Sequence, residues 1–298
     1  GFDYASVREL NPGLVYCNIW GFGIDGPYAG RAAFDDIIQG TSGLVALEAF
    51  GGKEPRFVPM LLADKTTGVF AAFAMAAALY HKLKTGEGQE IETPMFETMT
   101  SFAMIEHLAG EGFVPPLGPP GSERHAKPMR WPIRSKDGLV CILATSDKHW
   151  RGLTAAGGRP ELATAPRYDT RPKRLSRREE VIALTEEMAK TKTTAEWVEA
   201  LSEAGVPCMH VATLDEVVAD PHLHAVNFWQ EHDHPSEGRI RLMAPPYRMS
   251  KTPPEIRTMP PRFGQHTAEV LADLGYDAKT IEAMLAAGAA MAETREDA

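Results

Sequence analysis

The chain has 298 residues and a formal net charge of −9 at pH 7, with 44% hydrophobic and 24% charged residues. These values are typical of a globular protein, and the negative charge argues against nucleic acid as the main partner. The longest apolar stretch, residues 69–83, is too short to cross a bilayer, and the sequence shows no signal-peptide pattern. We therefore expect a cytoplasmic protein without a membrane partner.

The first part of the chain alternates between strand and helix patterns. Residues 14–20 carry β-branched and aromatic side chains and end at Gly21, which indicates a buried strand. A long apolar run then predicts a helix that begins near Lys65, is buried on most sides and ends with Gly86 as its C-cap. The other predicted elements here are a short helix over 35–47, a strand over 89–93 and a helix over 95–108.

Proline-rich segments at 114–120 and 245–254 divide the rest of the chain, and we interpret them as linkers. Strands and helices alternate before and between them, so the sequence predicts the α/β class. The predicted elements are a strand over 139–143, helices over 175–188 and 194–204, a short strand after 205–207, a hairpin strand over 239–242, and helices over 267–274 and 279–287.

Asp64 stands directly before the apolar run of the long predicted helix. Backbone N–H groups and the dipole at a helix N-terminus both favour negative charge, and this position gives the carboxylate two interpretations. One is an ordinary N-cap, which typically stabilises a helix by about 0.5–2 kcal/mol. The other is a covalent nucleophile toward an activated acyl group, because a carboxylate held ionised and partly shielded from water can attack it.

Residues 21–26 read Gly-Phe-Gly-Ile-Asp-Gly after the first predicted strand, which formally matches the G-x-G-x-x-G pattern of dinucleotide sites. Such a site needs a helix that begins at the third glycine, and a proline and a tyrosine follow that glycine here. We therefore interpret Gly21, Phe22 and Gly23 as part of a tight loop that lets the backbone approach a ligand or a neighbouring segment.

Two further polar clusters have competing interpretations. The histidine-rich stretch 222–234 is a candidate zinc site, but its spacings fit no common ligand set and its prolines indicate an exposed loop and hairpin, so we expect no metal.

Arg124 and His125, with Lys127 and Arg130 close behind, form a basic cluster after the first linker. This cluster is either a solvated loop or a contact for phosphates or a ligand carboxylate, which arginine can bind in bidentate fashion.

Short motifs follow one another along nearly the whole chain. They occupy residues 11–16, 21–23, 26–28, 39–43, 63–64, 67–68, 84–89, 124–125, 137–138, 205–208, 220–221, 244–246 and 264–267. In this order the motifs resemble those of the class III CoA-transferase family, which includes formyl-CoA transferase, carnitine CoA-transferases and α-methylacyl-CoA racemase.

The resemblance implies that Asp64 is the acyl-carrying residue. In the family the carboxylate attacks a donor acyl-CoA thioester to give a mixed anhydride, and the CoA thiolate returns to form an aspartyl-CoA thioester that an acceptor acid takes over. A coenzyme A thioester is then the co-substrate, and no cofactor is expected to be tightly bound. Backbone N–H groups at the helix start and in nearby glycine loops are candidates to stabilise the oxyanions.

The resemblance also assigns roles beside Asp64. The racemase branch uses a histidine opposite the aspartate, and Phe34 occupies that position here, which disfavours epimerisation because a phenyl ring cannot exchange a proton. Asp35 matches an acidic residue near the catalytic site of formyl-CoA transferase, and it is either a supporting residue or a structural residue at a helix start. The candidate residues for binding coenzyme A are Gly21, Phe22, Gly23, Asp35, Arg124 and His125.

The family architecture is a Rossmann-like large domain plus a smaller α+β domain, in subunits that interlock as a homodimer. By resemblance, residues 1–122 belong to the large domain, 123–245 form the small domain and 246–298 return to the large domain. Family members carry a further N-terminal segment with basic contacts to the CoA nucleotide. We expect either an enzyme completed by another polypeptide or a non-catalytic half that needs a CoA-binding partner, and the donor and acceptor acids stay open.

Overall fold

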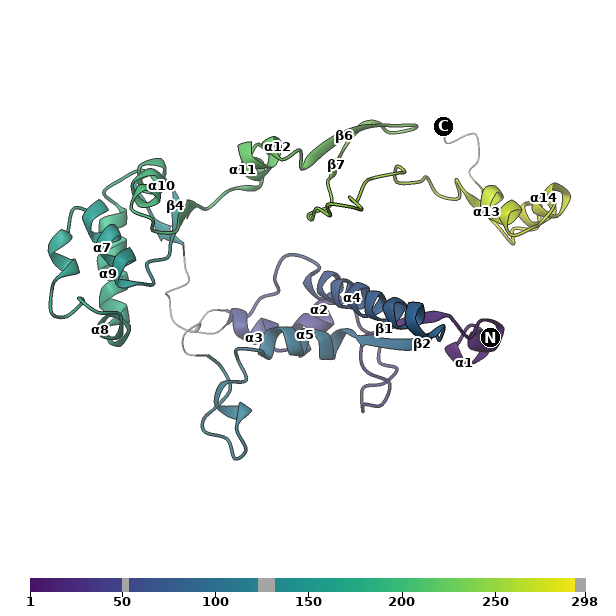
Figure 1. The fold of residues 1–298 in the computed structure, drawn as a ribbon, viewed down its shortest axis with the longest axis horizontal. Coiled ribbons are helices and arrows are strands. Elements are labelled where there is room, and N and C mark those ends of the chain that lie inside the picture. The colour runs from purple at the N-terminus through teal and green to yellow at the C-terminus, as the bar shows by residue number, and fades with distance from the viewer. Residues whose placement is uncertain (50–53, 123–131, 293–298) are drawn as a thin grey trace. The chain divides into compact units, whose positions relative to one another are not determined.

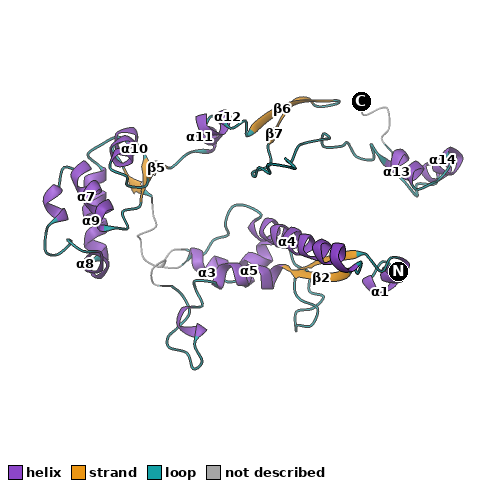
Figure 2. Cartoon of the chain, in the orientation of Figure 1, coloured by secondary structure: helices purple, strands orange, loops and turns teal. Residues whose placement is uncertain are grey.

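The computed structural model describes residues 1–49, 54–122 and 132–292 (Figure 1). The chain divides into two compact units, Gly1–His210 and Val211–Ala298, and each is considered by itself. Helices and strands alternate in the first unit, which confirms the predicted α/β class (Figure 2). The boundaries predicted at 122 and 245 remain predictions.

The N-terminal part is built on two parallel strands. β1 (Val15–Trp20) pairs with β2 (Gln89–Pro94) in a register that sets Val15 opposite Gln89. Parallel strands need a crossover connection, and helices supply it here. The helices are α1 (Tyr4–Leu10) before β1, then α2 (Asp35–Thr41), α3 (Leu44–Glu48) and α4 (Leu62–Thr85) in the crossover, and α5 (Met95–Met104) and the 3-10 helix η1 (Ala109–Gly112) after β2. The Rossmann-like detail stays a prediction.

Glycines and caps set the helix boundaries here. The helix predicted over 35–47 is divided, because Gly43 adopts the left-handed conformation (φ 88°) between α2 and α3. Gly86 ends α4 with φ 80°, and its N–H donates to the carbonyl of Lys82, which confirms the predicted C-cap. The predicted start near Lys65 is wrong, since α4 begins three residues earlier.

Helix α4 contacts both strands, α2 and α5 (Figure 1). Its buried residues, Ala63, Thr67, Ala71 and Ala78, follow one stripe of small side chains, which allows close approach to the neighbouring elements. The prediction of burial on most sides is wrong, because the large apolar side chains point away from this stripe. The exposed ones are Val69, Phe70, Phe73, Met75, Leu79, Tyr80 and Leu83.

In the part of the chain that the structure describes, α4 alone is long and apolar enough to cross a membrane by length and composition. It has 24 residues, so the length argument made for residues 69–83 does not exclude a span. A mostly buried core helix passes the same test, and α4 contacts β1 and β2 as such a helix would, but most of its large apolar side chains are exposed. The absence of a membrane partner remains a prediction.

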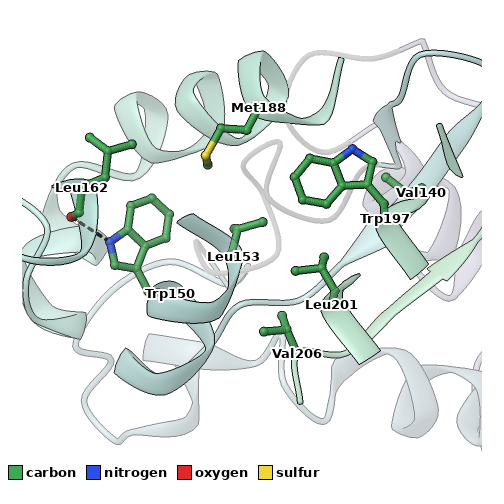
Figure 3. Close-up of a cluster of buried hydrophobic side chains, with 8 residues drawn as sticks. All are labelled: Val140, Trp150, Leu153, Leu162, Met188, Trp197, Leu201 and Val206. Atoms are coloured by element: carbon green, nitrogen blue, oxygen red, sulfur yellow. Dashed lines mark hydrogen bonds between the residues drawn. The ribbon is translucent and has the colours of Figure 1, made fainter. Parts of the chain in front are cut away.

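A second group of elements has its own core of buried side chains. β4 (Leu139–Ile142) pairs in antiparallel fashion with β3 (Ile133–Arg134) and with β5 (Cys208–His210). Trp150 and Trp197 lie in this core, and Figure 3 shows the indole N–H of Trp150 donating to the carbonyl of Leu162 at 3.1 Å. The indole N–H of Trp197 donates to the carbonyl of Ala189 at 2.8 Å. The helices are α7 (Asp147–Ala156), η3 (Pro160–Ala163), α8 (Arg171–Ser176), α9 (Arg178–Ala189) and α10 (Thr194–Glu203).

The strands predicted over 139–143 and after 207 and the helix predicted over 194–204 are confirmed in this group. The helix predicted over 175–188 is instead two helices, because Arg177 leaves the helical conformation (φ −121°, ψ 37°). The helix α7 was not predicted, although Ser146 accepts a hydrogen bond from the amide of His149 as a regular N-cap.

The second unit contains a hairpin and four helices within its described residues. β6 (Trp229–His234) pairs with β7 (Gly238–Met243), which confirms the predicted hairpin. The helices are α11 (Leu214–Val218), α12 (Pro221–Ala225), α13 (Thr267–Asp273) and α14 (Ala278–Ala286). The last two match the helices predicted over 267–274 and 279–287.

The histidines of the stretch 222–234 lie on α12 and β6. His234 is buried, and its Nδ1 accepts from the amides of Ser236 and Glu237 at 3.2 Å, while its Nε2 lies 2.7 Å from the carbonyl of Pro260. This histidine therefore fixes the hairpin turn. Among the residues that the structure describes, no three His, Cys, Asp or Glu side chains are grouped to hold a metal ion.

Candidate functional site

Asp64 is the third residue of α4, and its side chain is exposed. The N-cap position belongs to Leu61, and no side chain at that position bonds to the helix. Within the described ranges, the Asp64 carboxylate takes part in no hydrogen bond or ion pair, and the backbone amide of Asp64 donates to Asp35 Oδ1. The interpretation of Asp64 as an ordinary N-cap is therefore wrong, and its oxygens are available to a ligand.

The capping group of α4 comes from another helix. Asp35, the first residue of α2, is only 4% exposed, and its Oδ1 accepts from the amides of Ala63 (2.7 Å) and Asp64 (3.1 Å). A buried carboxylate here is stabilised by the helix dipole and by two charge-assisted hydrogen bonds. Asp35 therefore holds the turn that carries Asp64, which is a structural contact at a helix start, and its role as a supporting residue of the reaction stays a prediction.

These bonds change the expectation for oxyanion stabilisation. The amide of Leu62 donates to the carbonyl of Met60 (2.8 Å), and that of Lys65 donates to the carbonyl of Leu61 (3.3 Å). Together with the two amides bound to Asp35, all four N–H groups of the first turn are engaged. The start of α4 therefore does not offer the oxyanion donors that the sequence suggested.

Gln39 lies one turn after Asp35 on α2 and is fully buried. Its Nε2 donates to Asp35 Oδ2 at 2.6 Å and to the carbonyls of Val58 (3.3 Å) and Met60 (3.1 Å). Its Oε1 accepts from the amide of Val58 at 2.9 Å. The Gln39 side chain thus joins α2, residues 58–60 and, through Asp35, the start of α4. Sequence reasoning gave this residue no role.

The glycine loop after β1 packs against the same region. Phe22 is buried in a cluster with Ile38 of α2 and Ala63 of α4. A Cβ atom at Gly21 would lie 2.5 Å from the Cβ of Ala33, so only glycine fits at this close approach. The structure therefore brings Gly21 and Phe22 together with the helix starts that carry Asp35 and Asp64.

Two glutamates hold the glycine loop. Glu97 Oε1 accepts from the amide of Gly23 at 3.1 Å, and Glu92 Oε1 accepts from the amide of Ile24 at 2.9 Å. A Cβ at Gly23 would lie 2.6 Å from Glu97 Oε1. No helix begins at Gly26, as expected for a loop that is not a dinucleotide site. Sequence reasoning missed both glutamates, because they lie 74 and 68 residues from the amides that they bind.

Arg124 and His125, with Lys127 and Arg130, lie outside the described residues. Phe34 occupies the N-cap position of α2 and is 80% exposed. No proton-exchanging side chain therefore stands at the position where the racemase branch has its histidine.

The sequence matches CoA-transferase family III over residues 1–267. The chain belongs to this family. It is 28% identical over 300 residues to the succinyl-CoA:glutarate CoA-transferase of Homo sapiens, covering 97% of the chain and 66% of that relative. It is 30% identical over 279 residues to the succinate–glutarate CoA-transferase of Agrobacterium fabrum, covering 92% of the chain and 68% of that relative.

The fold agrees with this family membership. A crystal structure of a CAIB/BAIF family protein from Brucella suis is similar with a TM-score of 0.75 and 29% sequence identity, covering 92% of the chain and 71% of that protein. The chain thus spans about two thirds of the length of the relatives that it matches. The human and Agrobacterium fabrum relatives are both named as CoA-transferases.

Proposed function

We propose that the chain transfers coenzyme A from a donor acyl-CoA to a small carboxylic acid, with Asp64 as the covalent carrier. The Asp64 carboxylate attacks the thioester carbonyl of the donor, the C–S bond breaks, and CoA leaves as a thiolate beside a mixed anhydride. The thiolate then attacks the aspartyl carbonyl and releases the donor carboxylate. The product is an aspartyl-CoA thioester on Asp64.

The second half of the reaction repeats these steps in reverse. The acceptor carboxylate attacks the aspartyl thioester, which expels the CoA thiolate and gives a new mixed anhydride. The thiolate attacks the acceptor acyl carbon of this anhydride, so that acceptor acyl-CoA leaves and the Asp64 carboxylate is restored. Every step exchanges one activated acyl bond for another, so no external energy source is required.

One observation carries the proposal: the Asp64 carboxylate is unbonded within the described residues, although it lies at a helix start. A capping carboxylate would be tied to backbone amides, and Asp35 takes those amides here. An attacking oxygen must be able to reach a carbonyl carbon, and an engaged cap could not do so without breaking the helix end.

The relatives support the class of substrate. Two are named for transfer between succinyl-CoA or succinate and glutarate, and another, from Rhodopseudomonas palustris, for transfer between formyl-CoA and oxalate. We propose a small mono- or dicarboxylic acid as acceptor. The protein is proposed to act in the cytoplasm as an interlocked homodimer, without a membrane or nucleic-acid partner, and with coenzyme A as a co-substrate only.

A second candidate function rests on the exposed apolar face of α4. We propose, as the alternative, that the chain is a half that needs a CoA-binding polypeptide before it can act. The side chains of Phe73 and Leu83 are 75% and 85% exposed, which is unusual for a helix in an α/β layer. An acyl-CoA racemase of the same fold has no such support, since Phe34 cannot exchange a proton.

The test is a comparison of two aspartate variants in a CoA-transfer assay. Wild type, Asp64→Asn and Asp36→Asn are assayed with succinyl-CoA and formyl-CoA as donors and with glutarate, succinate and oxalate as acceptors. We expect Asp64→Asn to lose at least about 1,000-fold in kcat, as expected when a covalent nucleophile is removed. Asp36 is exposed and lies beside Asp35, so its variant is the matched control and should keep wild-type turnover.

Two results would count against the carrier role or favour the second candidate. Full turnover by Asp64→Asn, with deamidation excluded by intact mass, contradicts the carrier role. An inactive wild-type chain that becomes active when mixed with a CoA-binding polypeptide favours the second candidate.

A further inference from the structure

We propose that Gln39 is a positioning residue for the reaction, which fixes the carboxylate of Asp35 and thereby the turn of α4 that carries Asp64. This inference rests on the proposed function of Asp64 and names a residue to which that function assigns no part. Gln39 touches neither Asp64 nor a reacting atom, so its influence passes through Asp35.

The hydrogen bonds of Gln39 leave it almost no freedom. The side chain is fully buried, and both ends of its amide are bonded: Nε2 lies 2.6 Å from Asp35 Oδ2, and Oε1 lies 2.9 Å from the amide nitrogen of Val58. The second N–H group is directed to the carbonyls of Val58 and Met60. A buried amide satisfied at both ends is fixed in one orientation.

The effect of this orientation reaches Asp64 in two ways. Asp35 can direct its Oδ1 toward the amides of Ala63 and Asp64 only while its other oxygen has a buried partner, and Gln39 is that partner. Gln39 also holds residues 58–60, and the carbonyl of Met60 accepts from the amide of Leu62, the first residue of α4. Both routes end in the first turn of α4.

Catalysis by a covalent carrier depends on this precision. A displacement of the attacking carboxylate by about 1 Å can cost about 100-fold in rate. The Asp64 side chain has no partner of its own among the described residues, so its position depends on the backbone from which it projects. Gln39 therefore supplies, from the neighbouring helix, part of the rigidity that Asp64 lacks.

The first test measures geometry without any reaction. Amide hydrogen exchange at Ala63 and Asp64 is measured by NMR in the full chain for wild type, Gln39→Met and Ile38→Val. Ile38 is equally buried on α2 and packs in the cluster that contains Ala63 without a side-chain hydrogen bond, so Ile38→Val controls for a packing change at the same place. We expect exchange at both amides to rise at least about tenfold in Gln39→Met relative to Ile38→Val. Equal exchange in the two variants overturns the inference.

The second test separates positioning from substrate binding. In Gln39→Met we expect kcat to fall by about 100-fold, with the KM for acyl-CoA within about twofold of wild type, because geometry in the transition state is lost and ground-state binding is kept. Ile38→Val should keep both constants near wild type. A Gln39→Met enzyme with at least half of the wild-type kcat overturns the inference.

A conservative variant gives a signature that a purely structural role would not produce. Gln39→Glu places a second carboxyl group against Asp35 Oδ2, the Val58 amide and the carbonyls of Val58 and Met60. Only its protonated form can donate to Asp35, because two ionised carboxylates cannot share this contact. We expect its kcat relative to wild type to rise as the pH falls from 8 to 5.5, and a flat ratio contradicts the role.

The outcomes distinguish this inference from the proposed function. If wild type forms no adduct on Asp64 with any acyl-CoA, the proposed function fails, and the exchange comparison at Ala63 and Asp64 still decides whether Gln39 fixes the turn. If wild type forms the adduct and Gln39→Met forms it at the same rate, the inference fails and the proposed function stands.

Discussion

At the start of α4, two carboxylates lie next to the same backbone amide, that of Asp64. The carboxylate of Asp35 is buried and accepts from this amide, whereas the carboxylate of Asp64 itself is exposed and unbonded within the described residues. The capping function and the free carboxylate are thus divided between two residues that are 29 positions apart in the sequence. Because Asp35 caps α4, the Asp64 carboxylate can react without breaking the hydrogen bonds at the start of the helix.

This division predicts that the two aspartates differ strongly in their contribution to stability. Asp35→Ala removes two charge-assisted hydrogen bonds and leaves the buried amide of Ala63 without a partner, so the free energy of unfolding should fall by about 2–3 kcal/mol. Asp64→Asn breaks no bond of the described structure and should change it by less than about 0.5 kcal/mol. Urea denaturation followed by circular dichroism measures both. A loss in Asp64→Asn as large as in Asp35→Ala would mean that Asp64 caps the helix after all.

Asp137, between β3 and β4, has a carboxyl group that accepts hydrogen bonds from Thr194. The backbone N–H of Thr194, then the hydroxyl of Thr194, and to a smaller extent the hydroxyl of Ser135, lower the pKa of the Asp137 carboxyl. A carboxylate whose pKa is lower in the folded state than its unfolded value of about 3.9 contributes stability above that value and loses it as the pH falls through the folded pKa. The site is exposed, so the contribution is small.

The corresponding measurement is thermal unfolding of Asp137→Asn against wild type between pH 7 and pH 2.5. At pH 7 the variant should melt a few degrees below wild type, because the link to the start of α10 is weakened. The difference should shrink as the pH falls below 4. A difference that stays constant down to pH 2.5 would show that the ionised carboxylate is not responsible.

Among the secondary-structure elements, Gly68 in α4 and Gly88 before β2 have different surroundings. Gly68 lies inside α4, on its exposed side, and a Cβ atom there would meet nothing within 4 Å. Gly88 precedes β2, and a Cβ there would clash with the carbonyl of Leu14. A side chain at position 68 therefore has free space, whereas a side chain at position 88 would collide with the backbone of Leu14.

Alanine substitutions test this difference. Gly68→Ala should raise the free energy of unfolding by about 0.5–1 kcal/mol, because alanine loses less backbone entropy in a helix and strains nothing here. Gly88→Ala should destabilise the chain by several times that amount or prevent folding, because backbone must move. Chemical denaturation measures the free energy of unfolding of the two variants. Equal changes in this free energy would contradict the packing described for Gly88.

Local signals in the sequence were sufficient for several elements. The β-rich run before Gly21, the cap at Gly86 and the turn at Gly238 specify β1, the end of α4 and the β6–β7 hairpin through contacts between near neighbours. The candidate site depends on other contacts. The bond from the amide of Ala63 to Asp35 spans 28 residues, and that from the amide of Gly23 to Glu97 spans 74. The order of residue types along the chain does not predict which residues form such long-range hydrogen bonds.

The burial of α4 shows a second limit of sequence reasoning. Its apolar residues occur on all sides, which ordinarily predicts a helix surrounded by protein. In the structure only the stripe of small side chains is covered, and most of the large ones are exposed. The apolar residues of α4 indicate that its surface should be covered, but they do not indicate which polypeptide covers it.

At the scale of the whole molecule, this exposed face of α4 should govern how the chain behaves in solution. Large contiguous apolar patches on a protein promote association. We expect the 298-residue chain to bind a hydrophobic dye and to self-associate, and we expect the double variant Phe73→Gln, Leu83→Gln to reduce dye fluorescence to roughly half without lowering its melting temperature.

Light scattering after gel filtration measures the association, and Leu10→Gln is the matched control, because Leu10 is 88% exposed on α1 and outside this face. The control should associate as wild type does. A double variant that unfolds would show that Phe73 and Leu83 are buried in the chain itself, contrary to the structure.

The role of Asp64 as acyl carrier can be tested by trapping the covalent intermediate. The chain is incubated with an acyl-CoA that supports transfer, quenched with hydroxylamine and digested, and the modified peptide is sequenced by mass spectrometry. Hydroxylamine attacks an activated aspartyl group and leaves a hydroxamate on the residue that carried it. We expect this modification on Asp64, dependent on acyl-CoA and absent from Asp64→Asn. A modification on another residue, or turnover without any on Asp64, would contradict this role.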